Sequence, residues 1–172
     1  MSAEIFPREA FADVLSANSK FSRKFVDSEL AGTALRGLAI ITCMDSRISP
    51  LAIVGMDAGD AKILRNAGAR VTDDVLRTLV LATYLLGVSR VLVMPHTDCR
   101  MTQDDDAAIH QMIFEQHGVD TQSLEFRTTS DQRGALASDV NRIRSFPYLP
   151  KELVVGGAIY DVHSGTLEPI DC

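Results

Sequence analysis

The sequence lacks tryptophan altogether, has only three cysteines and carries no long apolar run. Its longest apolar stretch, residues 79–88, contains Thr, Tyr and Gly and is too short to cross a bilayer. The first residues have neither a basic region nor an apolar segment, so we expect no signal peptide and a cytoplasmic location. An odd number of cysteines without an export signal argues against a disulfide framework. The cysteines therefore remain as metal ligands, reactive thiols or buried apolar residues.

Positive charge is also scarce. The chain has 17 Lys plus Arg against 23 Asp plus Glu, which gives a net charge of −6, and it has no basic run. We therefore expect binding neither to nucleic acid nor to an anionic membrane. With 172 residues, of which 46% are hydrophobic, the chain is long enough for one domain with a full core, spanning residues 1–172.

Residues 1–36 differ in pattern from the rest. Phe11, Val14 and Leu15 have helical spacing, and Phe21 and Phe25 form another i, i+4 pair. The spacing predicts a helical arm that ends near Gly32. Amphipathicity alone leaves open whether this helix packs on its own domain or covers a partner subunit.

From residue 38 onward, apolar strands alternate with helices. Strands are predicted at residues 38–43, 61–64, 90–94 and 153–160, and helices at 73–86, 104–117 and 131–143. Residues 166–170 follow a Ser-Gly turn and are expected to pair antiparallel with the last strand. This alternation predicts an α/β fold with a mainly parallel sheet and right-handed crossovers.

Potential metal ligands follow two of these strands. Cys43 ends the first strand, while His96 and Cys99 follow the third in a His-x-x-Cys turn. Ligands of parallel sheets bind beyond the carboxyl ends of the strands. Two thiolates and one imidazole with an open fourth position match a catalytic zinc site. The alternative is two buried structural cysteines and a hydrogen-bonded histidine.

Three more residues lie near this edge. In an extended segment Asp45 and Arg47 face the same way as Cys43, although they could also form a plain surface ion pair. Gly68, in the run Arg-Asn-Ala-Gly at 65–68, would let the backbone approach a ligand and donate an N–H to a substrate oxygen. The alternative for Gly68 is an ordinary turn glycine.

Cys-x-Asp-x-Arg at 43–47, Arg-Asn-Ala-Gly at 65–68 and His-x-x-Cys at 96–99, in this order, resemble the β-class carbonic anhydrases. The similarity covers roughly residues 36–165 and is greatest to the small bacterial members. It implies a four-stranded parallel sheet with flanking helices and an added antiparallel strand. It also implies a homodimer or an assembly of dimers, with the N-terminal helix on the neighbouring subunit, which favours the arm interpretation of residues 1–36.

The resemblance implies a zinc ion held by Cys43, His96 and Cys99, with Asp45 and Arg47 as the catalytic dyad. The expected reaction is reversible hydration of carbon dioxide to bicarbonate by zinc-bound hydroxide. In one form of the family water fills the fourth zinc position, and in the other the dyad aspartate, here Asp45, closes it; the sequence leaves both open. Hydrolysis of CS₂ or COS on the same site, or a non-catalytic zinc-binding protein, are the alternatives.

Two departures from the family pattern stand out. Arg100 follows the second cysteine where many members have glycine; it could alter the pocket mouth, but its spacing favours an ion pair with Asp104. Because the chain has no tryptophan, we do not expect the accessory bicarbonate pocket of some members in its usual form.

Overall fold

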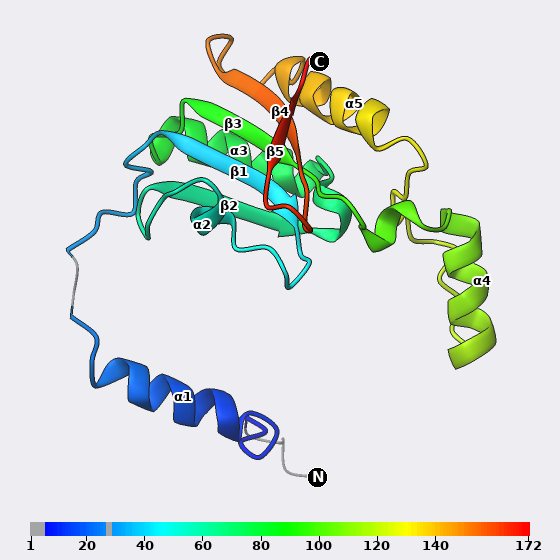
Figure 1. Cartoon of the computed structure of the whole chain (residues 1–172), viewed down its shortest axis with the longest axis horizontal. Helices are drawn as coiled ribbons and strands as arrows, with labels where there is room; N and C mark the ends of the chain where they lie inside the picture. Colours follow the sequence, from blue (N-terminus) through cyan, green and yellow to red (C-terminus); the bar gives the residue numbers. More distant parts are fainter. Residues whose placement is uncertain (1–5, 27–28) are drawn as a thin grey trace. The chain divides into compact units, whose positions relative to one another are not determined.

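The structure, a computed structural model, describes residues 6–26 and 29–172 and divides into two compact units, Met1–Ala31 and Gly32–Cys172. In the first unit lies helix α1, Ala12–Ser22 (Figure 1). None of its side chains is buried. The predicted helix is confirmed, although it ends at Ser22 rather than near Gly32. Parts of the predicted arm, residues 1–5 and 27–28, lie outside the described residues. That residues 1–172 form a single domain stays a prediction.

The second unit is built on one five-stranded sheet. Its strands are β1 (Leu38–Cys43), β2 (Ala61–Asn66), β3 (Arg90–Met94), β4 (Val154–Tyr160) and β5 (Leu167–Ile170). The order is β2-β1-β3-β4-β5; the first four are parallel and β5 is antiparallel to β4, as predicted. All six residues of β1 are buried, which explains why this strand is a continuous apolar run.

Helices connect the strands. They are α2 (Pro50–Ile53), α3 (Asp73–Leu85), α4 (Asp106–His117) and α5 (Gln132–Arg144), with 3₁₀ turns η1 (Ala67–Ala69) and η2 (Arg100–Thr102). The three long helices of this unit begin at side-chain caps, Thr72, Asp105 and Asp131, which accept from backbone N–H groups three residues on. Because Asp105 is the cap, α4 begins two residues later than predicted. The short elements α2, η1 and η2 escaped prediction because they have too few residues to show a period.

The two faces of the sheet bury different residues. Ala39 and Ile41 of β1 belong to a core cluster with the buried residues of α3 and α5, whereas Leu38 and Ile40 pack with Cys43, Met94 and Cys99 in a second cluster. The alternation of side chains along a strand separates Leu38 and Ile40 from Ala39 and Ile41. Cys43, the last residue of β1, departs from this alternation and packs with the second cluster. Cys43 and Cys99 thus pack in the same cluster, at the edge where β1 and β3 end.

Helix α4 differs from α3 and α5. It has no buried residue, and Figure 1 shows it (yellow-green) projecting beyond the sheet. In the described part of the chain, no helix is both long enough and apolar enough to cross a membrane.

Candidate metal centre

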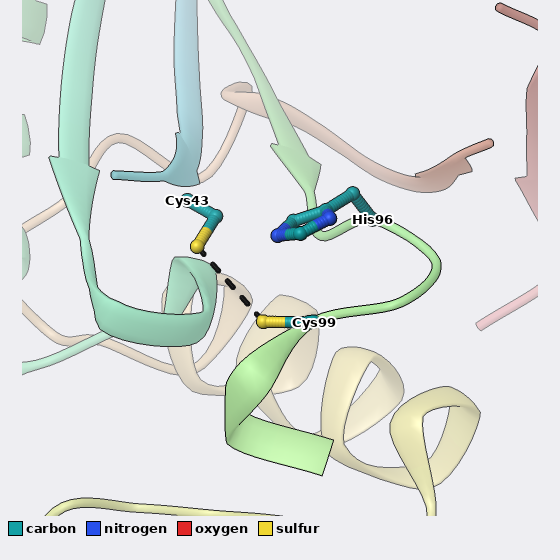
Figure 2. A group of neighbouring side chains, drawn as sticks. All are labelled: Cys43, His96 and Cys99. Atoms are coloured by element: carbon teal, nitrogen blue, oxygen red, sulfur yellow. Dashed lines mark hydrogen bonds between the residues drawn. The ribbon is translucent and has the colours of Figure 1, made fainter. Parts of the chain in front are cut away.

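Three side chains meet where β1 and β3 end. Cys43 is the last residue of β1, and His96 and Cys99 lie in the loop after β3 (Figure 2). All three are buried, and their ligand atoms lie within 4.8 Å of one another. The two sulfur atoms are 3.9 Å apart, with one thiol donating to the other. The structure thus brings together the three residues predicted as metal ligands.

The imidazole of His96 is oriented for a ligand role. Its Nδ1 lies 2.7 Å from the carbonyl oxygen of Thr97. A carbonyl oxygen only accepts, so Nδ1 carries the hydrogen and the lone pair is on Nε2. Nε2 is buried and has no hydrogen-bond partner among the described residues. The ring is also secured through the backbone, because the side chain of Gln132 donates to the His96 carbonyl at 2.8 Å.

These donors fit a zinc ion. An unpartnered buried nitrogen is costly, and a metal bound beside the two sulfurs would satisfy it. Two thiolates and one neutral imidazole form a Cys₂His set, which leaves the fourth position of a tetrahedral zinc for a reacting molecule. The hydrogen bond from Nδ1 to Thr97 is the support that metal-bound histidines ordinarily have.

The pKa values of the Cys43 and Cys99 thiols are shifted in opposite directions. Hydrogen bonding with Cys99 lowers the pKa of the Cys43 thiol against the effect of burial, and His96 and the backbone amides of Gly68 and Asp45 act in the same direction as Cys99. The same hydrogen bond, together with burial, raises the pKa of Cys99. Cys43 is therefore the sulfur that is prepared to be a thiolate.

Asp45 and Arg47 form a two-pronged pair beside this cluster. Arg47 donates from Nε to Oδ1 of Asp45 at 3.0 Å and from Nη2 to Oδ2 at 2.7 Å, and its backbone N–H adds a bond to Oδ1 at 2.9 Å. These hydrogen bonds hold the pKa of the Asp45 carboxyl well below its usual range. Oδ2 of Asp45 lies 3.8 Å from Nε2 of His96, so the ionised carboxylate adjoins the three ligands.

Gly68 lies in the turn η1 with φ +76°, a conformation that favours glycine. A Cβ atom there would come within 3.3 Å of the side chain of Met101. The backbone amide of Gly68 is directed to the Cys43 sulfur, whose pKa it lowers. This close approach explains the glycine, while the predicted contact of Gly68 with a substrate stays a prediction.

Two residues of the site escaped the sequence analysis. Arg65 donates to the carbonyl oxygens of Cys43 (2.9 Å) and Asp45 (2.6 Å), and it thereby supports the loop that follows β1. Asp98 accepts from the same guanidinium of Arg47 that holds Asp45. The sequence marked Arg65 only by its place in the run 65–68, and Asp98 only by its place between the predicted ligands His96 and Cys99.

Arg100 forms the predicted ion pair with Asp104. Its guanidinium also approaches the sulfur of Met112 on α4, at 3.8 Å. Arg100, which departs from the family pattern, therefore contacts α4 and the residues just before it.

Comparison with known proteins finds similar sequences and structures among carbonic anhydrases and a carbon disulfide hydrolase. A family model described as carbonic anhydrase matches residues 38–167. Beta-carbonic anhydrase 1 of Mycobacterium tuberculosis is 33% identical over 134 residues, 77% of this chain and 81% of that protein. A carbon disulfide hydrolase of Acidithiobacillus thiooxidans is 27% identical over 154 residues, 78% of this chain and 77% of that protein. The crystal structure of a carbonic anhydrase from Streptococcus mutans superposes with a TM-score of 0.88 at 32% identity, covering 97% of this chain and 99% of the other.

Proposed function

The chain belongs to the β-class carbonic anhydrase family, and on this premise we propose that it is a zinc enzyme that interconverts carbon dioxide and bicarbonate. The observation that carries the proposal is the position of Asp45, which is ionised, paired with Arg47 and 3.8 Å from the unpartnered Nε2 of His96. A purely structural zinc site has four protein ligands and needs no such carboxylate beside it.

Cys43, His96 and Cys99 would hold the zinc ion. When bound, zinc supplies a Lewis acid that makes water nucleophilic near neutral pH. The backbone and side-chain bonds from Arg47 keep Asp45 a pure hydrogen-bond acceptor. Asp45 can then orient the O–H of a nucleophile in the site, and Arg47 keeps the carboxylate in place while it does so.

Hydrolysis of CS₂ or COS is the second candidate. Its support is the carbon disulfide hydrolase relative, which matches this chain over a similar length to the mycobacterial carbonic anhydrase. CO₂, COS and CS₂ are all small linear molecules with an electrophilic carbon, so one set of catalytic groups can serve all three. We place it second because the more similar of the relatives compared are carbonic anhydrases.

We also propose that the enzyme is a homodimer or an assembly of dimers. The support is helix α1 with its N-cap Phe11. The side chains of Phe11, Val14, Leu15 and Phe21 are all exposed. In and beside this helix, Phe6 pairs with Phe11 and Phe21 with Phe25, at ring-centroid distances of 5.3 and 5.6 Å. Such an apolar helix would gain from burial against a second copy.

Stopped-flow hydration of CO₂ by zinc-loaded protein between pH 6 and pH 9, with release of sulfide from CS₂ and COS measured in parallel, tests the assignment. Hydration of CO₂ that requires zinc is the expected result. Sulfide release without CO₂ hydration would replace it by the second candidate, and activity on none of the three would indicate a non-catalytic zinc protein. Cys172→Ser is the matched control for Cys43→Ser, because Cys172 is outside the cluster and its replacement should leave activity unchanged.

A further inference from the structure

Asp98 has an unusual backbone conformation between two of the proposed ligands. Its φ is +53°, in the left-handed region that few residues other than glycine adopt, although Asp and Asn tolerate it best. The loop is anchored next to it, because the Thr97 N–H donates to the Tyr160 carbonyl at 2.9 Å and the Thr97 hydroxyl donates to Asp161 at 3.2 Å. The bonds of Thr97 therefore hold the backbone at Asp98 in place, and the side chain of Asp98 can pair with another residue.

That residue is Arg47. Its Nη1 donates to Oδ2 of Asp98 at 2.8 Å and its Nη2 donates to the Asp98 carbonyl oxygen at 3.0 Å, while Nε and Nη2 hold the two oxygens of Asp45. One planar guanidinium thus joins the loop after β1, which follows Cys43, to the loop that carries His96 and Cys99. Because the guanidinium is planar and rigid, the bond to Asp98 also fixes the orientation of the N–H groups that hold Asp45.

We propose that Asp98 is a positioning residue: by anchoring Arg47, it keeps the Asp45 carboxylate out of the metal-ligand set. This inference rests on the proposed function. Asp45 lies only 3.8 Å from Nε2 of His96, so a small movement would bring it among the ligands, where it would compete with other molecules for the fourth position. Among the described residues, Arg47 is the side chain that holds both oxygens of Asp45.

The expected size of the effect of Asp98 follows from the solvent exposure of its ion pair with Arg47. The side chains of Arg47 and Asp98 are 44% and 48% exposed, so their pairing corresponds to a roughly two- to fivefold change in an equilibrium. An ion pair of this kind contributes little to the stability of the fold. Its consequence should instead be measurable as competition between Asp45 and added anions for the metal.

The experiment compares Asp98→Gly with Asp98→Asn in cobalt-substituted protein, with azide affinity read from the visible spectrum. Both replacements remove one negative charge and tolerate a positive φ, but only asparagine keeps a side-chain acceptor for Arg47. We expect azide to bind Asp98→Gly about two- to fivefold more weakly than Asp98→Asn, with kcat/KM in the zinc enzymes following the same order. Glu168→Gln, which removes an exposed ion pair with Arg133 elsewhere, should change neither quantity.

A double-variant cycle shows whether the effect passes through Arg47. In an Arg47→Ala background the difference between glycine and asparagine at position 98 should vanish. Equal azide affinities of the two single variants, a difference that persists without Arg47, or failure to bind cobalt would each overturn the proposal. If the azide difference is present but the zinc protein acts on neither CO₂ nor CS₂, the proposed function fails while the positioning role of Asp98 stands.

Discussion

Oδ2 of Asp45 lies 3.8 Å from Nε2 of His96, although both oxygens of Asp45 are held by the side chain of Arg47. The carboxylate therefore adjoins the three proposed ligands while its hydrogen bonds direct it to a cation outside that set. This arrangement keeps Asp45 ionised at neutral pH and positions it next to the metal centre.

Removal of any one proposed ligand should abolish stable zinc binding. We expect Cys43→Ser, His96→Ala and Cys99→Ser each to lower zinc affinity by about 100-fold or more, since even changes behind a ligand cost 10–100-fold. Metal analysis after dialysis against a chelator measures this, with Cys172→Ser as the control that should retain full zinc. Full retention by one of the three variants would remove that residue from the ligand set.

Asp45→Asn should keep zinc and fold but lose activity. The amide still offers one acceptor oxygen, but it has no charge to hold Arg47 and can present its NH₂ group to the site. We expect kcat/KM to fall by about 10²–10⁴-fold. Asp74→Asn, which weakens an exposed ion pair with Arg77 on α3, serves as the control and should have wild-type rates. Wild-type turnover by Asp45→Asn would disprove the dyad assignment.

Gly68→Ala should affect the site as well as the fold. A positive φ costs a residue with a Cβ about 1–2 kcal/mol, and at Gly68 that Cβ would also press on Met101 at 3.3 Å. Gly118→Ala is the matched control, because its φ is +67° but no atom lies within 4 Å of the added Cβ. Urea unfolding should show a loss in both variants, whereas reduced zinc affinity is expected for Gly68→Ala alone. Equal zinc affinity in the two variants would contradict a role of this close approach in the site.

Asp106 should stabilise the protein in a pH-dependent way. Its carboxylate accepts from the Thr128 hydroxyl and from the backbone N–H groups of Thr128, Phe126 and Arg127, and these hydrogen bonds lower its pKa to about 2. We expect Asp106→Asn to lower the free energy of unfolding by about 1.5–3 kcal/mol at pH 7. Denaturant titration of both proteins measures this difference.

The sign of the pH effect follows from the lowered pKa of Asp106. Its stabilisation is complete above the unfolded-state pKa, about 4, and disappears as the pH falls through about 2. The difference between wild type and Asp106→Asn should therefore shrink over that interval. Glu125→Gln, which removes an exposed ion pair with Arg127 in the same segment, should change stability by less than about 0.5 kcal/mol. A difference that is constant from pH 7 to pH 2 would show that the charge of Asp106 does not matter.

The exposed apolar residues of α1 and of the segment that follows it should be needed for assembly. Phe21 and Phe25 are 62% and 59% exposed, and we expect Phe21→Ser/Phe25→Ser to shift a dimer toward monomer at micromolar concentration. Sedimentation equilibrium measures the change, with Lys20→Ala on the same helix as a control that should stay dimeric. A wild-type protein that sediments only as a monomer would refute the proposed dimer.

The sequence by itself determined the strands and the three candidate ligands. Continuous apolar runs at residues 38–43 and 90–94 predicted buried parallel strands, and the structure has strands with these bounds. Because parallel neighbours end at the same edge, Cys43 and the His-x-x-Cys turn could be expected to meet there. These inferences needed only the local pattern of apolar residues and the general rule for parallel sheets.

Tertiary structure alone decided how the site is supported. Arg65 reaches the carbonyls of Cys43 and Asp45, and Arg47 reaches Asp98, across 20 to 51 positions of the chain. No periodicity marks such contacts, because they depend on the order β2-β1-β3 and on turns with special backbone angles, as at Gly68 and Asp98. A side chain's local pattern reports whether it is buried, whereas its hydrogen-bond partner depends on which loops the folded sheet brings side by side.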